Sequence, residues 1–183
     1  MAIIFITGNA NKFGEASAIV PGLSMEDIDL PEIQDLKPQA VIRAKLAEAA
    51  KRRPGPFVVE DTSLSLECLG GLPGTFIKWF LQAMGPRGLY EIASRFKDFR
   101  ATALTMIGYM DEAGEVRFFE GSLAGTIVAP RGETKFGWDP VFRPSGHLKT
   151  FAEMTKDEKN AISMRRMAFM GLKKHLDGLE DGR

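Results

Sequence analysis

The fold is decided by the stretch Ala2-Ile3-Ile4-Phe5-Ile6-Thr7-Gly8-Asn9-Ala10-Asn11-Lys12, in which an apolar run is followed by a polar break. The apolar run is rich in residues that favour strands, so it predicts a short buried strand over residues 2–7. Residues 8–11 end that strand, and Phe13, Ala16 and Ile19 then recur at helical spacing over residues 12–20. A strand, a loop and a helix in succession form the unit from which α/β proteins are built.

The same patterns continue along the chain. Small and apolar residues at helical spacing predict a helix over residues 38–53, and residues 57–59 indicate a second buried strand that carries Glu60 and Asp61 at its carboxyl end. The other expected elements are helices at residues 77–84, 87–96 and 157–176 and a hairpin of strands at residues 100–110 and 115–128. This order predicts an α/β fold with a mixed sheet. A length of 183 residues corresponds to about one domain, expected to span residues 1–183.

The charges of the chain are balanced, with 24 Lys and Arg against 24 Asp and Glu. Proteins that bind nucleic acid or an anionic membrane usually carry a clear excess of basic residues, so we expect neither partner. The single cysteine, Cys68, cannot form an intramolecular disulfide, and no apolar stretch reaches the length of a membrane span. A cytoplasmic protein is the simplest interpretation, and any anion must be bound by local charges.

The loop after the first strand has the features of a small anion site. A helix amino terminus offers unpaired N–H groups and the positive end of its dipole, Gly8 permits close backbone approach, and Lys12 adds a positive charge. The segment lacks the spacing of a P-loop or of a dinucleotide-binding motif. The alternative is an ordinary turn in which Asn9 caps the helix.

Carboxylates occur where they could hold a metal ion. Glu60 and Asp61 follow a buried strand, and Glu32 lies in an irregular stretch before the second helix. Mg²⁺ is commonly held by one or two carboxylates together with substrate phosphates, and an aspartate beside metal-bound water could act as a general base. The alternative is that Glu60 and Asp61 are only polar groups at a strand end near solvent.

The segment Phe136-Gly137-Trp138-Asp139-Pro140 combines two aromatic rings with a carboxylate. It could form a rigid wall that stacks on a purine while Asp139 accepts a hydrogen bond from the base edge. The alternative is a hydrophobic anchor in which Trp138 fills the core.

Five motifs occur in a recognisable order: Thr7-Gly8-Asn9-Ala10-Asn11-Lys12, Val59-Glu60-Asp61-Thr62-Ser63-Leu64, Gly70-Gly71-Leu72-Pro73-Gly74, Phe136-Gly137-Trp138-Asp139-Pro140 and Glu158-Lys159-Asn160-Ala161. With these motifs the chain resembles the inosine triphosphate pyrophosphatase family, also called the Ham1-like non-standard purine nucleotide pyrophosphatases. The resemblance extends from about the first strand to the last helix.

This resemblance implies a Mg²⁺-dependent hydrolase that converts ITP, dITP and XTP to the monophosphate and pyrophosphate, and so removes them from the nucleotide pool. It also implies an elongated mixed sheet flanked by helices, two lobes with a central cleft, and a homodimer. The residue roles that it implies are as follows: Thr7, Gly8, Asn9, Lys12 and Lys45 at the phosphates; Glu32 and Asp61 at the metal; Asp61, Glu32 and Lys12 in catalysis; Phe136, Gly137, Trp138 and Asp139 at the base; Lys159 and Arg165 on the 6-oxo group; and Thr62, Lys78 and Ser163 as further substrate contacts.

One position departs from the family pattern. Near the last helix that pattern looks like Ser-His-Arg, whereas this chain has Ser163-Met164-Arg165, so Met164 replaces the histidine. A thioether is only a weak hydrogen-bond acceptor, whereas an imidazole both donates and accepts. Two alternatives follow from this difference. The chain could carry out the same chemistry with altered base selection, or it could be a catalytically weak nucleotide-binding protein.

Overall fold

The computed structural model describes residues 3–133 and 137–181, which form two compact units. The first unit contains residues 3–61, 105–121 and 164–181, and the second contains residues 62–104, 122–133 and 137–163. Three long strands contribute residues to both: β3 (Phe57–Leu66), β5 (Arg100–Met110) and β6 (Val116–Ile127). Each unit is therefore built partly from the same strands.

In the part of the chain that the structure describes, seven strands form one sheet in the order β2-β1-β3-β5-β6-β7, with β4 (Pro73–Gly74) paired to β3. β1 (Ile3–Ile6) pairs in parallel with β2 (Leu23–Glu26) and with β3. The pairs β3–β4 and β6–β7 are antiparallel, β7 being Phe142–Pro144. The sheet is mixed, which confirms the predicted α/β class.

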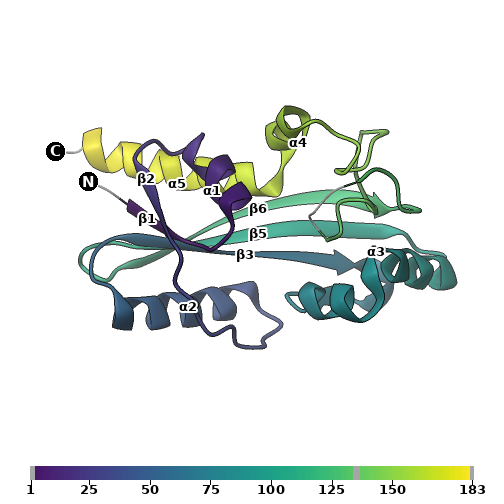
Figure 1. Cartoon of the computed structure of the whole chain (residues 1–183), viewed down its shortest axis with the longest axis horizontal. Helices are drawn as coiled ribbons and strands as arrows, with labels where there is room; N and C mark the ends of the chain where they lie inside the picture. Colours follow the sequence, from purple (N-terminus) through teal and green to yellow (C-terminus); the bar gives the residue numbers. More distant parts are fainter. Residues whose placement is uncertain (1–2, 134–136, 182–183) are drawn as a thin grey trace. The chain divides into compact units, whose positions relative to one another are not determined.

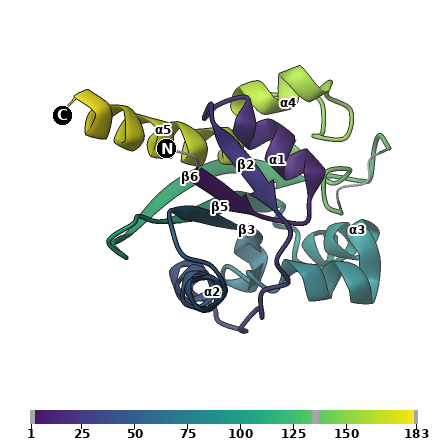
Figure 2. The same ribbon diagram turned by 60° about the vertical axis from the view of Figure 1, so that its left-hand side comes forward.

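The helices that the structure describes in the first unit are α1 (Ala10–Ser17), α2 (Pro38–Arg52) and α5 (Met164–Asp181). Figures 1 and 2 both show α1 and α5 on one side of the strands of this unit and α2 on the other side. β1 is thus covered on both faces, so it forms a continuous apolar run rather than an alternating pattern. All four residues of β1 are buried for this reason.

The core of the first unit lies between its strands and the pair α1 and α5. The Phe5 and Phe169 rings meet edge to face, with their centroids 5.4 Å apart. The buried residues of this cluster are Ile3, Phe5, Ala16, Val20, Leu23, Val58, Ile107, Tyr109, Ala168, Phe169 and Leu172. On the opposite face, a side chain at Gly108 would collide with Ile42 and Leu46 of α2, so the glycine allows α2 to pack closely.

The second unit contains α3 (Ile77–Phe96) and α4 (Lys156–Ile162). α3 is interrupted at Gly85, whose φ of 65° is not helical, which matches the expected break between two helices. α4 begins with a capping box, because the Thr155 hydroxyl accepts from the Glu158 N–H and the Glu158 carboxylate accepts from the Thr155 N–H. The break within α3 and the start of α4 are therefore explained by local sequence.

Some element boundaries differ from the sequence predictions. The helix expected over residues 157–176 is two helices, α4 and α5, because Ser163 has the extended values φ −66° and ψ 147°. The strand expected at residues 57–59 continues to Leu66, and the first helix covers residues 10–17 rather than 12–20. The short strands β2, β4 and β7 were not predicted. Within the described residues, no helix combines the length and the apolar character that a membrane crossing requires.

Candidate active site

The loop between β1 and α1 is held by its own side chains. The Asn9 N–H donates to the Thr7 hydroxyl at 3.1 Å, and the Asn9 carboxamide oxygen accepts from the N–H groups of Asn11 and Lys12 at 3.0 and 3.1 Å. Asn9 is thus the N-cap of α1, as the alternative interpretation of this loop proposed. Gly8 is exposed, and a Cβ at this position would lie 2.7 Å from the Asp27 carboxylate. The loop is compact, and its phosphate contacts stay predictions.

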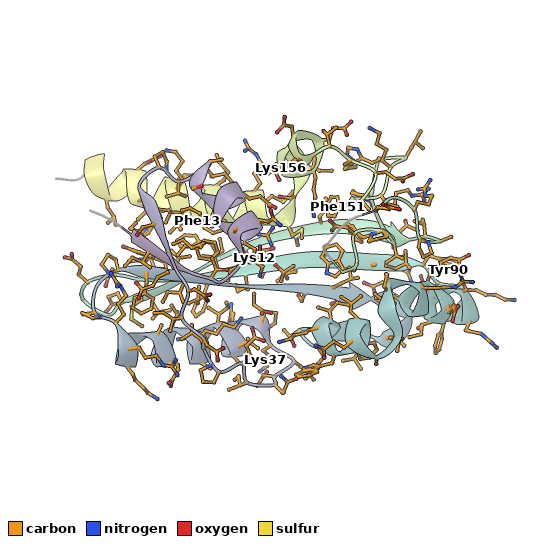
Figure 3. The ribbon with its side chains drawn as sticks, in the orientation of Figure 1. Lys12, Phe13, Lys37, Tyr90, Phe151 and Lys156 are labelled. Carbon is orange, nitrogen blue, oxygen red and sulfur yellow. The ribbon has the colours of Figure 1, made fainter. Side chains whose placement is uncertain are left out.

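Lys12, in the first turn of α1, takes part in a buried network of charges. Its ammonium lies 3.1 Å from Glu60 Oε1 on β3, and Figure 3 shows the side chain extending from α1 towards the strands of this unit. Glu60 also accepts from Arg165 of α5, with Nε to Oε2 at 2.9 Å and Nη2 to Oε1 at 3.1 Å. Arg165 Nη1 donates in addition to Glu15 Oε2 at 2.7 Å. Three elements therefore meet at one carboxylate.

The electrostatics of this network keep Glu60 and Arg165 charged. Burial by itself would raise the pKa of Glu60, but Arg165 and Lys12 outweigh burial and hold the pKa far below its ordinary value. Burial would likewise lower the pKa of Arg165, but Glu60 and Glu15 raise it. A buried charge of this kind is tolerated only when it is paired and hydrogen-bonded, as it is here.

A second group of charges is centred on Lys45 of α2. Its ammonium lies 2.9 Å from Glu32 Oε1 and 3.1 Å from Asp61 Oδ1, and it donates to the Glu60 carbonyl oxygen at 3.3 Å. Burial opposes the charge on Lys45, but Asp61 and Glu32 raise its pKa. Burial raises the pKa of Asp61 against the pull of Lys45. Two carboxylates from separate segments therefore converge on one cation.

Neighbouring residues of β3 serve the two groups because successive side chains of a strand point to opposite faces. Glu60 reaches Lys12 and Arg165 on the side of α1 and α5, whereas Asp61 reaches Lys45 on the side of α2. The resemblance grouped Lys12 with Glu32 and Asp61 in catalysis, and in the structure the ion pair of Lys12 is with Glu60. Glu60 was predicted only as a possible metal ligand and Glu15 was not predicted, although strand alternation next to Asp61 could have indicated a separate partner for Glu60.

The donor set around Lys45 fits the predicted metal in part. Within residues 3–133 and 137–181, no group of three or more His, Cys, Asp or Glu side chains could hold a metal ion. Glu32 and Asp61 nevertheless each place one carboxylate oxygen close to the Lys45 ammonium nitrogen, at 2.9 and 3.1 Å. Mg²⁺ typically takes one or two carboxylates and completes its six ligands with substrate phosphates and water. The pair is therefore suited to a metal that arrives with a phosphate substrate.

In the second unit, the predicted base-binding residues form a group of their own. Asp139 is buried, and its Oδ2 accepts from Lys159 Nζ at 2.5 Å. The Lys159 ammonium also lies 5.1 Å from the centre of the Phe151 ring. Asp139 and Lys159 are thus brought together, while their contact with a base stays a prediction.

Trp138 is 1 % exposed and packs on Phe142 and Phe151, with ring centroids 5.4 and 6.1 Å away. This placement matches the alternative in which Trp138 anchors the loop in the core. Gly137 is closely packed against α3, because a Cβ at this position would lie 2.7 Å from Leu81 Cδ1. Phe136, predicted for the same wall, lies outside the described residues.

The remaining predicted contacts are spread over the second unit. Thr62 directly follows Asp61 on β3 and is partly buried. Lys78 lies in the first turn of α3, with its ammonium 5.5 Å from the centre of the Trp79 ring. Ser163 is buried, and it is the residue of extended conformation that separates α4 from α5 in the sequence. The substrate roles of all three stay predictions.

Comparison with known proteins assigns this chain to a family. The model of the Ham1 family matches residues 3–175. An inosine triphosphate pyrophosphatase from Kluyveromyces lactis is 44 % identical over 184 aligned residues, which cover 95 % of this chain and 95 % of that protein.

Solved structures agree with this assignment. A Ham1 protein from Coxiella burnetii has a TM-score of 0.84 at 26 % identity, covering 97 % of this chain and 100 % of its own. A nucleoside-triphosphatase, or dITP/XTP pyrophosphatase, from Mycobacterium abscessus has a TM-score of 0.72 at 27 % identity, covering 94 % and 98 %. The Ham1 protein from Staphylococcus aureus shares the fold, with a TM-score of 0.79 at 24 % identity over 97 % and 99 %. The sequence match over nearly the whole chain and the shared fold together place this chain in the Ham1 family.

Proposed function

We propose that the chain is a nucleoside triphosphate pyrophosphatase that hydrolyses ITP, dITP and XTP to the monophosphate and pyrophosphate. The observation that carries this proposal is the position of the Lys45 ammonium between Glu32 and Asp61, beside the end of a buried strand segment. Such a site offers a cation for phosphate oxygens and carboxylates for a metal within a few ångströms. The names of the Kluyveromyces lactis and Mycobacterium abscessus relatives support the same activity.

Glu32 and Asp61 would hold the Mg²⁺ ion, with the substrate phosphates completing its coordination. When bound, the ion would neutralise charge on the triphosphate and lower the pKa of its bound water. Lys45 already neutralises both carboxylates, so we expect its ammonium to move from them to a phosphate oxygen when a metal and a triphosphate bind. Lys12 would contribute a second positive charge to the phosphates.

Asp61 is the residue that we propose as the general base. Burial raises its pKa, and a carboxylate with a raised pKa is a stronger base once it is ionised. It would accept a proton from the water that attacks the α-phosphorus, with pyrophosphate as the leaving group. This assignment is supported by its convergence with Glu32 on one cation.

For base recognition we propose Asp139, which forms a partly buried pair with Lys159, together with Lys159 and Arg165 at the 6-oxo group. Arg165 is itself tied to Glu60 and Glu15, so its place is fixed before any substrate arrives. We further propose that residues 1–183 act as a single domain, in a cytoplasmic homodimer.

A second candidate is the same hydrolysis with altered base selection. The observation that favours it is the burial of Met164, which is 1 % exposed at the start of α5 and directly precedes Arg165. A site that hydrogen-bonds a substrate group discriminates more strongly than an apolar one. Comparing the ratio of ITP to GTP hydrolysis in the wild type and in Met164→His tests this candidate. Equal ratios would rule it out.

The main proposal is tested by measuring pyrophosphate release from ITP, XTP, dITP, ATP and GTP, with and without Mg²⁺. We expect Mg²⁺-dependent release that is fastest with the inosine and xanthosine nucleotides. Tight ITP binding without product would instead indicate the catalytically weak nucleotide-binding protein.

A further inference from the structure

Glu60 lies between two cations that come from different helices. Its Oε1 is 3.1 Å from the Lys12 ammonium and 3.1 Å from Arg165 Nη2, and its Oε2 is 2.9 Å from Arg165 Nε. The Glu60 side chain is only 1 % exposed, so these charges interact with little screening by water. A single carboxylate therefore determines how closely the two cations can lie.

The two cations depend on Glu60 to different degrees. The Arg165 side chain is 4 % exposed and is also bound to Glu15, through Nη1 to Oε2 at 2.7 Å. The Lys12 side chain is 21 % exposed, and a lysine stem has more rotational freedom than a planar guanidinium held at two edges. Without Glu60, repulsion from Arg165 would move Lys12 towards solvent, while Arg165 would keep Glu15.

We propose that Glu60 is the positioning residue of Lys12: its carboxylate holds the ammonium against β3 and separates it from the Arg165 guanidinium. An ammonium has three protons, so Lys12 bound to one Glu60 oxygen retains donors for a phosphate. The inference rests on the proposed role of Lys12 at the triphosphate. It adds a residue that touches no substrate but fixes one that does.

A simple counter-ion role makes the opposite prediction, which allows a decisive test. If Glu60 only offset positive charge, its neutralisation would leave the site more positive and would strengthen the binding of a polyanion. If it positions Lys12, its neutralisation removes an ordered phosphate contact and weakens that binding. The sign of the change in affinity separates the two roles.

The probe is inorganic triphosphate, whose binding is measured by calorimetry at a fixed Mg²⁺ concentration. For Glu60→Gln we expect the Kd to rise about tenfold, which corresponds to about 1.4 kcal/mol. Lys12→Met should raise the Kd at least as much. Glu15→Gln is the matched control, since Glu15 binds Arg165 but not Lys12 in the structure, and its Kd should stay within about twofold of the wild type.

Thermal denaturation shows whether each variant is folded. If Glu60→Gln does not fold, Glu60→Asp is tested in its place. The shorter side chain moves the carboxylate away from Lys12, so the Kd for inorganic triphosphate should rise about threefold. An unchanged or lower Kd in the folded Glu60 variant, or a Kd that does not depend on Lys12, overturns the proposal. Binding of inorganic triphosphate needs neither base nor turnover, so failure of the proposed hydrolysis is detected separately, by pyrophosphate release from ITP in the wild type.

Discussion

Gly121 of β6 allows α5 to pack directly on the strand, and Gly121→Ala tests how strongly this contact stabilises the protein. A Cβ at this position would lie 1.9 Å from the Met164 carbonyl oxygen, 2.8 Å from Met167 Cβ and 2.9 Å from the Ala168 nitrogen. Two of these atoms are backbone, so they cannot move aside by changing a rotamer. The start of α5 would have to retreat from β6 by roughly 1 Å.

Overpacking of a core commonly costs about 1–3 kcal/mol, and a collision with backbone belongs at the upper end of that range. We therefore expect Gly121→Ala to lower the free energy of unfolding by about 3 kcal/mol. In a protein of this size each kcal/mol shifts Tm by roughly 2–4 °C, so Tm should fall by about 6–12 °C. The displaced segment carries Arg165, so the variant should also bind nucleotide more weakly.

Gly178→Ala is the matched control, because it makes the same substitution further along α5. A Cβ at Gly178 would have no neighbour within 4 Å, and alanine favours a helix over glycine by up to about 1 kcal/mol. Both substitutions reduce the entropy of the unfolded chain alike, so the difference in Tm between the two variants reports the collision at Gly121. Thermal denaturation followed by circular dichroism gives both Tm values. If Gly121→Ala melts within about 2 °C of Gly178→Ala, the packing argument is wrong.

Three further predictions concern the charged groups. Asp61→Asn should reduce kcat for pyrophosphate release much more than it weakens nucleotide binding; near-normal release would contradict the base assignment. Lys45→Gln removes the cation shared by Glu32 and Asp61, so Mn²⁺ titration without nucleotide should show tighter metal binding than in the wild type, and an unchanged affinity would argue against their convergence. Burial and then Arg117 lower the pKa of His175 below its ordinary value of 6.5, so folding disfavours its protonation. The contribution of neutral His175 to the free energy of unfolding is fully present above pH 6.5 and is lost as the pH falls through the lower pKa of the folded state. Between pH 8 and pH 5, Tm should therefore fall more in the wild type than in His175→Gln. Parallel Tm profiles of the two proteins would refute this.

Local patterns determined most of the secondary structure from sequence. The strand at residues 100–110, the helix that begins at Pro38 and the break at Gly85 all match, because apolar periodicity, proline and glycine act over a few residues. The errors occurred where the sequence signal was weak. The two-residue strand β4 is too short to show a pattern, and Ser163 carries no helix-breaking side chain although it separates α4 from α5.

In the candidate site, too, some residues were predicted from sequence, whereas the contacts of others became evident only in the structure. The family resemblance implied Lys45, Glu32 and Asp61, and the structure brings these three together. Glu60 stands beside Asp61 in the same motif, yet its partner Arg165 is 105 residues away in sequence.

The α/β class and the family follow from the sequence alone, because both rest on local patterns and motifs, and the same motifs supplied the lysines and carboxylates of the candidate site. Only the tertiary structure decided which carboxylate meets which cation, because alternate side chains of β3 face different helices and each face packs against a distant segment. It also decided that Trp138 is buried among Phe142 and Phe151, since the burial of an aromatic ring depends on the segments that pack around it.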